Sequence, residues 1–184
     1  MRVIAGAAKG RRLKGPPERT LRPTSDLVRG AMFDMLQAMQ ADLSRVLDLY
    51  AGTGALGIEA LSRGDGRCDF VEKDSRFCQV IRDNLQITSL ADRSAVFCLP
   101  VERALTRLSG EYSLILADPP YQDEKVEGLL QRVAASSLTG AETVILWEHS
   151  KRKEPAPALG SLGLLTSRRH GDTVFSVYRT GGSP

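Results

Sequence analysis

The stretch "VLDLYAGTGALGIEAL", from Val46 to Leu61, determines the expected fold of this chain. A short apolar run leads into Gly52, Gly54 and Gly57, which have the spacing G-x-G-x-x-G, and an amphipathic run follows them. A strand, a tight glycine turn and a helix in this order form the nucleoside-binding loop of many parallel α/β sheets. The motif is weak evidence on its own, because an ordinary strand-to-helix turn can have the same spacing.

Apolar and amphipathic runs alternate along the rest of the chain, which predicts an α/β fold with helices on both faces of a sheet. We expect seven strands, mostly parallel, with an antiparallel C-terminal hairpin around 171–172. The expected strands are 45–52, 68–74, 94–100, 112–121, 143–150 and the two arms of 162–179. The expected helices are 24–39, capped by Thr24 or Ser25, and 55–64, 75–90, 101–110 and 123–137.

Positive charge is concentrated at the start of the chain. The 184 residues have a formal net charge of +3, but the first thirty contain eight basic and only two acidic residues. We expect residues 1–40 to form a basic β-hairpin and helix extension, and residues 41–184 to form the main domain. A solvated chain end is the alternative explanation. The candidate contacts to a nucleic-acid phosphate backbone are Lys9, Arg11, Arg12 and Lys14, with Lys151, Arg152 and Lys153 as a rival surface.

The cysteines and histidines argue against metal and triad chemistry. Cys68, Cys78 and Cys98 have no C-x-x-C spacing, so we expect buried thiols and neither a disulfide framework nor a zinc site. His149 and His170 form no H-x-x-x-H pair and stand beside no obvious Ser or Cys nucleophile, so a metal hydrolase or a catalytic triad is not expected. No run reaches the ~20 apolar residues of a membrane span, and no signal peptide is recognisable, so a cytoplasmic location is expected.

Two acids near the glycine motif distinguish between possible cofactors. Glu72 ends the second strand, where a carboxylate accepts hydrogen bonds from ribose hydroxyls, although it could also only solvate the strand end. Asp48 stands four residues before Gly52 and favours a positively charged amino-acid group over a pyrophosphate. The pattern therefore favours S-adenosylmethionine over NAD. The predicted cofactor-binding residues are Asp48, Ala51, Gly52, Thr53, Gly54, Glu72 and Lys73.

The run "ADPPY", residues 117–121, ends the strand that is expected beside the first one, so it should face the glycine loop. A rigid double-proline turn is the alternative explanation. An acid, two prolines and an aromatic residue at a strand end opposite a cofactor loop favour a functional site over a structural turn, so Asp118, Pro119 and Tyr121 are the predicted catalytic residues.

These motifs resemble those of class I S-adenosylmethionine-dependent methyltransferases that act on exocyclic amino groups. With the N-terminal "RVIAG…KGRRL…LRPTSDLVRGAMFDML", the chain resembles over nearly its whole length the bacterial RsmD-type 16S ribosomal RNA (guanine-N2)-methyltransferases. The resemblance implies a Rossmann-like fold, S-adenosylmethionine as methyl donor, and a guanine of 16S rRNA (the family's guanine 966) in the small ribosomal subunit or its assembly intermediate as acceptor. For methylation of a base amino group, the resemblance implies that the Asp118 carboxylate and the Pro119 carbonyl accept its N–H bonds and that Tyr121 stacks on the extruded base. Whether Asp118 also acts as a base stays open. We also expect a monomer that uses neither metal nor membrane.

Three alternatives remain. D-P-P-Y also fits a DNA or another RNA amino-group methyltransferase, but the short chain leaves no room for a target-recognition domain. A non-catalytic RNA-binding protein with a vestigial cofactor fold is disfavoured by the acids described above, and an NAD-dependent oxidoreductase by Asp48. One departure from the resemblance concerns adenine: Leu99, Pro100 and Val101 stand where many methyltransferases have an acid, so only backbone and apolar contacts are expected there.

Overall fold

The computed structural model describes residues 1–15 and 25–181. The strands are β1 (Arg45–Leu49), β2 (Arg67–Glu72), β3 (Ser94–Cys98), β4 (Leu114–Ala117), β5 (Val144–Ser150), β6 (Ala158–Leu159), β7 (Leu162–His170) and β8 (Thr173–Thr180). The helices are α1 (Asp26–Ala38), α2 (Ala55–Arg63), α3 (Ser75–Thr88), α4 (Val101–Ala104) and α5 (Val126–Ala134), with a 3-10 turn at Ala91–Arg93. α4 begins at Val101 as predicted but ends at Ala104, where a turn at 105–107 replaces the rest of the expected helix, and α5 is shorter than predicted at both ends.

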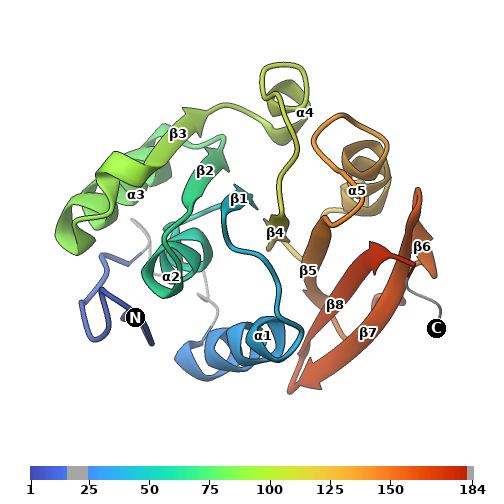
Figure 1. The fold of residues 1–184 in the computed structure, drawn as a ribbon, viewed down its shortest axis with the longest axis horizontal. Coiled ribbons are helices and arrows are strands. Elements are labelled where there is room, and N and C mark those ends of the chain that lie inside the picture. The colour runs from blue at the N-terminus through green and yellow to red at the C-terminus, as the bar shows by residue number, and fades with distance from the viewer. Residues whose placement is uncertain (16–24, 182–184) are drawn as a thin grey trace.

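The strands form one sheet in the order β3-β2-β1-β4-β5-β8-β7-β6 (Figure 1). β3, β2, β1, β4 and β5 are parallel, whereas β8, β7 and β6 pair in antiparallel fashion. The predicted mostly parallel α/β sheet with an antiparallel C-terminal hairpin is therefore confirmed. The described residues contain eight strands rather than seven, because the segment before the hairpin folds back on β7 and buries Leu159.

Each face of the sheet is covered by its own helices (Figure 1). α1, α2 and α3 pack on one face, where Met32, Ile58 and Ile81 are buried. α4 and α5 pack on the other face, where Val101 and Leu130 are buried. Burial on both faces explains why the central strands are almost continuously apolar.

The register of the central strands brings three acids to one end of the sheet. Asp48 pairs with Leu116, and Leu116 pairs with Leu146. Asp118 lies two residues after Leu116, and Glu148 lies two residues after Leu146. Because side chains alternate between the faces of a strand, all three acids belong to the face covered by α1, α2 and α3.

The start of the chain turns back on itself through one antiparallel bridge, between Arg2 and Arg12, and forms a loop without regular strands, which we call the N-terminal hairpin. The Val3 amide donates to the Arg11 carbonyl at 3.0 Å, and the Gly10 amide donates to the Val3 carbonyl at 2.9 Å. Three apolar side chains fix the hairpin in the core beside α1 and α2: Val3, Ala8 and Leu13. The boundary at residue 40 stays a prediction.

α1 begins after Ser25, whose hydroxyl accepts from the Val28 amide at 3.2 Å. Thr24, the other predicted cap, lies outside the described residues.

Of the three predicted buried thiols, Cys68 and Cys78 are buried but Cys98 is exposed, so the prediction was wrong for Cys98. Cys98 ends β3, and β3 is an edge strand with no neighbour on its outer side in the described sheet. Within the described ranges, we find no helix with the length and apolar character to span a bilayer.

Candidate active site

The glycine loop connects β1 to α2 through left-handed backbone. Gly52 and Gly54 have φ of +54° and +78°, and Tyr50 just before them has φ of +59°. A Cβ atom on Gly57 would lie 2.4 Å from the Phe70 ring, so only glycine lets α2 pack this closely on β2. The first two glycines of the motif therefore make the turn, and the third makes the helix–strand contact.

Glu72 closes the glycine loop from the end of β2. One carboxylate oxygen accepts from the Gly52 amide at 3.0 Å, and the other accepts from the Asp74 amide at 2.9 Å. A carboxylate can accept about four hydrogen bonds, so ribose hydroxyls remain possible partners. Glu72 thus ends β2, as predicted, and contacts the glycine loop, while its contact with ribose stays a prediction.

The other predicted cofactor residues surround this point. The Ala51 amide donates to the Val71 carbonyl at 3.0 Å, and Thr53 is almost fully buried within the loop. Lys73 follows Glu72 directly and is exposed. Leu99, Pro100 and Val101 follow the neighbouring strand end, because Cys98 pairs with Glu72 in the β2–β3 register. Their expected contact with adenine stays a prediction.

Asp48 is buried under the glycine loop, with only 1% of its surface exposed. One carboxyl oxygen accepts from the Gly57 amide at 2.9 Å, and the other has no hydrogen-bond partner among residues 1–15 and 25–181. Burial raises the pKa of Asp48 to about 7, and the nearby charges of Asp118 and Glu72 act in the same direction. An unsatisfied buried carboxyl oxygen is costly, and a cationic group would satisfy it.

The Asp-Pro-Pro-Tyr run begins where β4 ends, beside the end of β1. Pro119 is buried, and the Tyr121 side chain is 51% exposed. The Tyr121 hydroxyl donates to Glu148 Oε1 at 3.1 Å and lies 2.7 Å from Thr173 Oγ1. Partial burial raises the pKa of Tyr121 to about 12, so the hydroxyl stays protonated at neutral pH. The ring is thus held by its polar end while much of its surface stays accessible.

A cavity of about 410 Å³ lies beside this run. Its walls come from the loop after β4, including Pro119 and Tyr121, from the start of α5, and from the end of β5, including Trp147 and Glu148. Asp118 and the predicted cofactor residues are not among the residues that line it. The contribution of β5 was not predicted from the sequence. The available signal was the polar "WEHS" at the end of an otherwise apolar strand adjacent to β4.

His149 contacts a serine that is distant in sequence. Its Nε2 lies 2.9 Å from Ser176 Oγ, and its Nδ1 lies 3.1 Å from the carbonyl oxygen of the adjacent Ser150. Burial lowers the pKa of His149, and Ser176 is fully buried. A neutral imidazole beside an inaccessible hydroxyl stabilises the β5–β8 contact and offers no nucleophile to a substrate.

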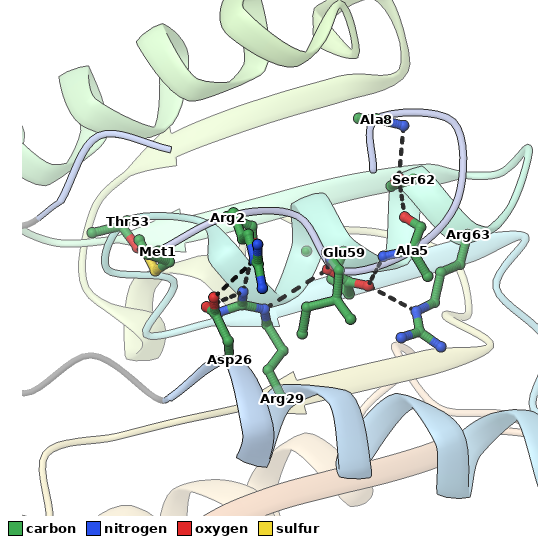
Figure 2. A network of polar contacts seen from close by, with 12 residues as sticks. Met1, Arg2, Ala5, Ala8, Asp26, Arg29, Thr53, Glu59, Ser62 and Arg63 are labelled. Atoms are coloured by element: carbon green, nitrogen blue, oxygen red, sulfur yellow. Dashed lines mark hydrogen bonds and ion pairs between the residues drawn. The ribbon is translucent and has the colours of Figure 1, made fainter. Parts of the chain in front are cut away.

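A buried polar network fixes the N-terminal hairpin to α1 and α2 (Figure 2). Glu59 of α2 is fully buried and accepts from the Ile4 and Ala5 amides at 2.8 and 3.0 Å. It also accepts from Arg63 Nε at 2.8 Å, and Arg29 Nε lies 3.8 Å from it. This network was not predicted from the sequence, because Glu59 occupies a helical position that is usually solvated.

The predicted RNA-binding side chains are all exposed on the hairpin. Lys14 forms an ion pair with Asp83 at 2.7 Å, and Arg11 donates to the Ile87 carbonyl at 3.1 Å. Asn84 accepts from the Lys14 amide at 2.7 Å and donates to the Thr53 carbonyl at 3.0 Å. Asn84 therefore connects the basic hairpin directly to the glycine loop, a link that the sequence did not indicate.

Comparisons with known proteins cover nearly the whole chain. The family model described as conserved hypothetical protein 95 matches residues 1–179. The protein YlbH of Bacillus subtilis (strain 168) is 35% identical over 185 residues, which cover 99% of this chain and 100% of YlbH. Ribosomal RNA small subunit methyltransferase D of Escherichia coli (strain K12) is 31% identical over 179 residues, covering 97% and 89%. A solved hypothetical protein of Thermus thermophilus has a TM-score of 0.84 at 28% identity, covering 98% and 99%.

Proposed function

The chain belongs to the family described as conserved hypothetical protein 95, which includes RsmD-type methyltransferases, and from this premise we propose that it methylates ribosomal RNA. The proposed reaction transfers a methyl group from S-adenosylmethionine to the exocyclic N2 amino group of a guanine in 16S rRNA. The proposed position is the family's guanine 966, in the small subunit or an assembly intermediate. The observation that carries the proposal is the convergence of Asp48, Glu72 and Asp118 on the glycine loop.

The residues around the loop fit S-adenosylmethionine. The buried Asp48 oxygen that lacks a partner within the described ranges suits the ammonium group of the cofactor's amino-acid end. Glu72, bonded to the Gly52 amide, suits the ribose hydroxyls. When bound, the cofactor supplies an electrophilic methyl group on a sulfonium. The protein's remaining task is to align a nucleophile with that group.

The Asp-Pro-Pro-Tyr run would hold the nucleophile. The amino nitrogen of guanine is conjugated with the ring, and acceptors directed at its two N–H bonds favour the pyramidal geometry in which its lone pair attacks. The Asp118 carboxylate and the Pro119 carbonyl would be these acceptors, and Tyr121 would stack on the base. The nitrogen must also lose a proton, which the Asp118 carboxylate would accept directly or through water.

The basic hairpin would hold the RNA backbone. Its four cationic side chains are exposed and lie on a rigid element that Glu59 and Asn84 fix beside the glycine loop. This position supports a contact between Lys9, Arg12 and phosphates close to the target base, while Arg11 and Lys14 also bind the protein body.

The test is methyl transfer to a ribosomal substrate. We expect the purified protein to label small ribosomal subunits that lack the modification when it is incubated with methyl-labelled S-adenosylmethionine, and we expect mapping to place the label on N2 of one guanine. Label on an adenine, on RNA outside the small subunit, or on no RNA at all would contradict the proposal. The same incubation with Asp118→Ala is the control for contaminating activity.

A further inference from the structure

A second carboxylate, Glu148, lines the cavity beside the Asp-Pro-Pro-Tyr run. It lies near the end of β5, next to the strand that leads into Asp118, and only 3% of its surface is exposed. Its register partner across the antiparallel pair is Phe175, which belongs to the core on the face of α1, α2 and α3. Glu148 and Asp118 therefore share a face at the same end of adjacent strands.

Glu148 is tied to the residue that is proposed to stack on the base. Its Oε1 accepts from the Tyr121 hydroxyl at 3.1 Å, so the carboxylate lies at the edge of the Tyr121 ring. An ionised carboxylate can accept about four hydrogen bonds and donates none. A base that stacks on the Tyr121 ring would therefore place one of its edges beside the Glu148 carboxylate, which can only accept hydrogen bonds.

The cavity also contains a buried donor. Trp147 is 2% exposed and lines the same cavity, and its Nε1–H has no acceptor among the residues that the structure describes. Buried donors without acceptors are rare in folded proteins. A cavity of about 410 Å³ is within the size range of small-molecule sites. The cavity therefore has room for a purine base, and Glu148 supplies a carboxylate in its wall.

The chemistry of the purines distinguishes what such a pocket accepts. Guanine presents two adjacent donors, N1–H and the N2 amino group, and a carboxylate complements both. Adenine presents the unprotonated N1 beside its amino group, so a carboxylate there faces a lone pair. Sites built to bond a substrate N–H reject analogues that lack it, because their own buried group is then left unpaired.

We propose that Glu148 is a specificity-determining residue that accepts the N1–H of the target guanine while Asp118 and Pro119 accept its amino group. The inference rests on the proposed function, since it presumes a purine amino group in this cavity. It assigns the choice of guanine over adenine to β5, outside the Asp-Pro-Pro-Tyr run.

A base analogue tests this assignment. 2-Aminopurine has the amino group of guanine but carries no hydrogen on N1. After the methylated guanine has been mapped, small subunits are reconstituted with 16S rRNA that has either guanine or 2-aminopurine at that nucleotide. The measured quantity is the ratio of kcat/KM for the two substrates. We expect the wild-type protein to prefer guanine strongly.

Glu148→Gln should reduce this ratio about 10- to 100-fold, because the amide can donate to an unprotonated N1 and no longer supplies a charged acceptor to guanine. Glu127→Gln is the matched control, since Glu127 lines the same cavity from α5 and pairs with Lys153. Tyr121→Phe removes the hydrogen bond to Glu148 and keeps the ring. Both control variants should leave the ratio unchanged, whatever their effect on the rates.

The outcomes are distinct. An unchanged ratio in a folded Glu148→Gln that binds S-adenosylhomocysteine normally would show that Glu148 only positions Tyr121, and would overturn the inference. If Glu148→Gln does not fold, the wild-type ratio still decides, because equal rates on both bases would show that N1–H is not recognised. Failure of the wild-type protein to methylate any guanine would instead refute the proposed function.

Discussion

Asp48 couples the stability of the fold to the candidate cofactor site. Its pKa is raised from 3.8 to about 7, mainly by burial. Between these two values the folded protein retains a proton that the unfolded chain has released, so this residue makes the fold less stable as pH rises toward 7. Above pH 7 the penalty is constant. A bound cationic group would lower the pKa of Asp48 and offset this penalty, because it favours the ionised carboxylate.

Asp48→Asn should therefore stabilise the protein at pH 8 by up to a few kcal/mol, and by little at pH 4. It should also weaken the binding of S-adenosylhomocysteine, because the charge that meets the ammonium group is absent from the variant. Chemical denaturation at both pH values and calorimetry at pH 8 measure the two effects. Wild-type affinity should rise as pH increases through 7, and a pH-independent affinity would contradict the assignment.

Glu72 should contribute to cofactor affinity without determining the fold. We expect Glu72→Ala to weaken S-adenosylhomocysteine binding by ~1 to 3 kcal/mol, because hydrogen bonds to a charged acceptor are removed. These include the bonds that order the loop at Gly52 and Asp74. Glu72→Gln retains one acceptor oxygen and should weaken binding less. If calorimetry gave wild-type affinity for Glu72→Ala, the acid would only solvate the end of β2.

Asp118 should act on turnover more than on binding. Its proposed contact strengthens only as the amino nitrogen becomes pyramidal, so Asp118→Ala should lower kcat by at least ~10-fold while S-adenosylhomocysteine binds as before. Asp118→Asn keeps an acceptor and should retain partial activity. Single-turnover methylation of small subunits gives the rates, and normal turnover by Asp118→Ala would refute the role of the Asp-Pro-Pro-Tyr run.

At the scale of elements, the sequence predicts strands and their ends better than contacts between distant segments. The strand before Gly52 and the acid at the end of β2 were predictable, because apolar runs and terminal polar residues are local signals. The position of Glu148 in the cavity wall was not predictable, because it depends on the pairing of β5 with β4. The short β6 was also missed, since two residues give no periodicity. The buried role of Glu59 required knowledge that the hairpin packs on α2.

Glu59 offers the clearest element-scale test. Glu59→Ala removes the acceptor for two hairpin amides and takes a nearby anion away from the buried Arg29, so we expect the unfolding free energy to fall by about 3 to 5 kcal/mol. Glu142→Ala is the matched control, because that acid is exposed and pairs with Arg179 at the surface. It should change stability by less than ~1 kcal/mol. Urea denaturation of both variants measures the difference, and equal effects would mean that the network stabilises little.

At the scale of the whole molecule, the hairpin links RNA binding to the glycine loop. Lys9 and Arg12 are exposed and suitable for substitution, whereas Lys14 and Arg11 also bind α3. If Lys9 and Arg12 bind phosphates, replacing both by Ala should flatten the slope of log affinity against log salt by about 0.7 to 0.9 for each phosphate that is no longer neutralised. Affinity for S-adenosylhomocysteine should be retained.

Filter binding of small subunits over a range of salt concentrations measures this slope. Lys151→Ala with Arg152→Ala is the matched control, because these residues form the rival basic surface after β5. If the control flattens the slope and the hairpin variant does not, RNA is held at the end of β5 and the hairpin has only a structural role.

The placement of Met1 has a practical consequence for how the protein is produced. Its carbonyl accepts from the Leu13 amide at 3.2 Å, and its sulfur lies 3.8 Å from Thr53 Oγ1 in the glycine loop. An affinity tag fused before Met1 would emerge beside that loop, where it could obstruct ligands and distort measured affinities. A tag fused after the last residue would follow β8, which β4 and β5 separate from β1 in the sheet order. Ligand measurements should therefore use C-terminally tagged or cleaved protein.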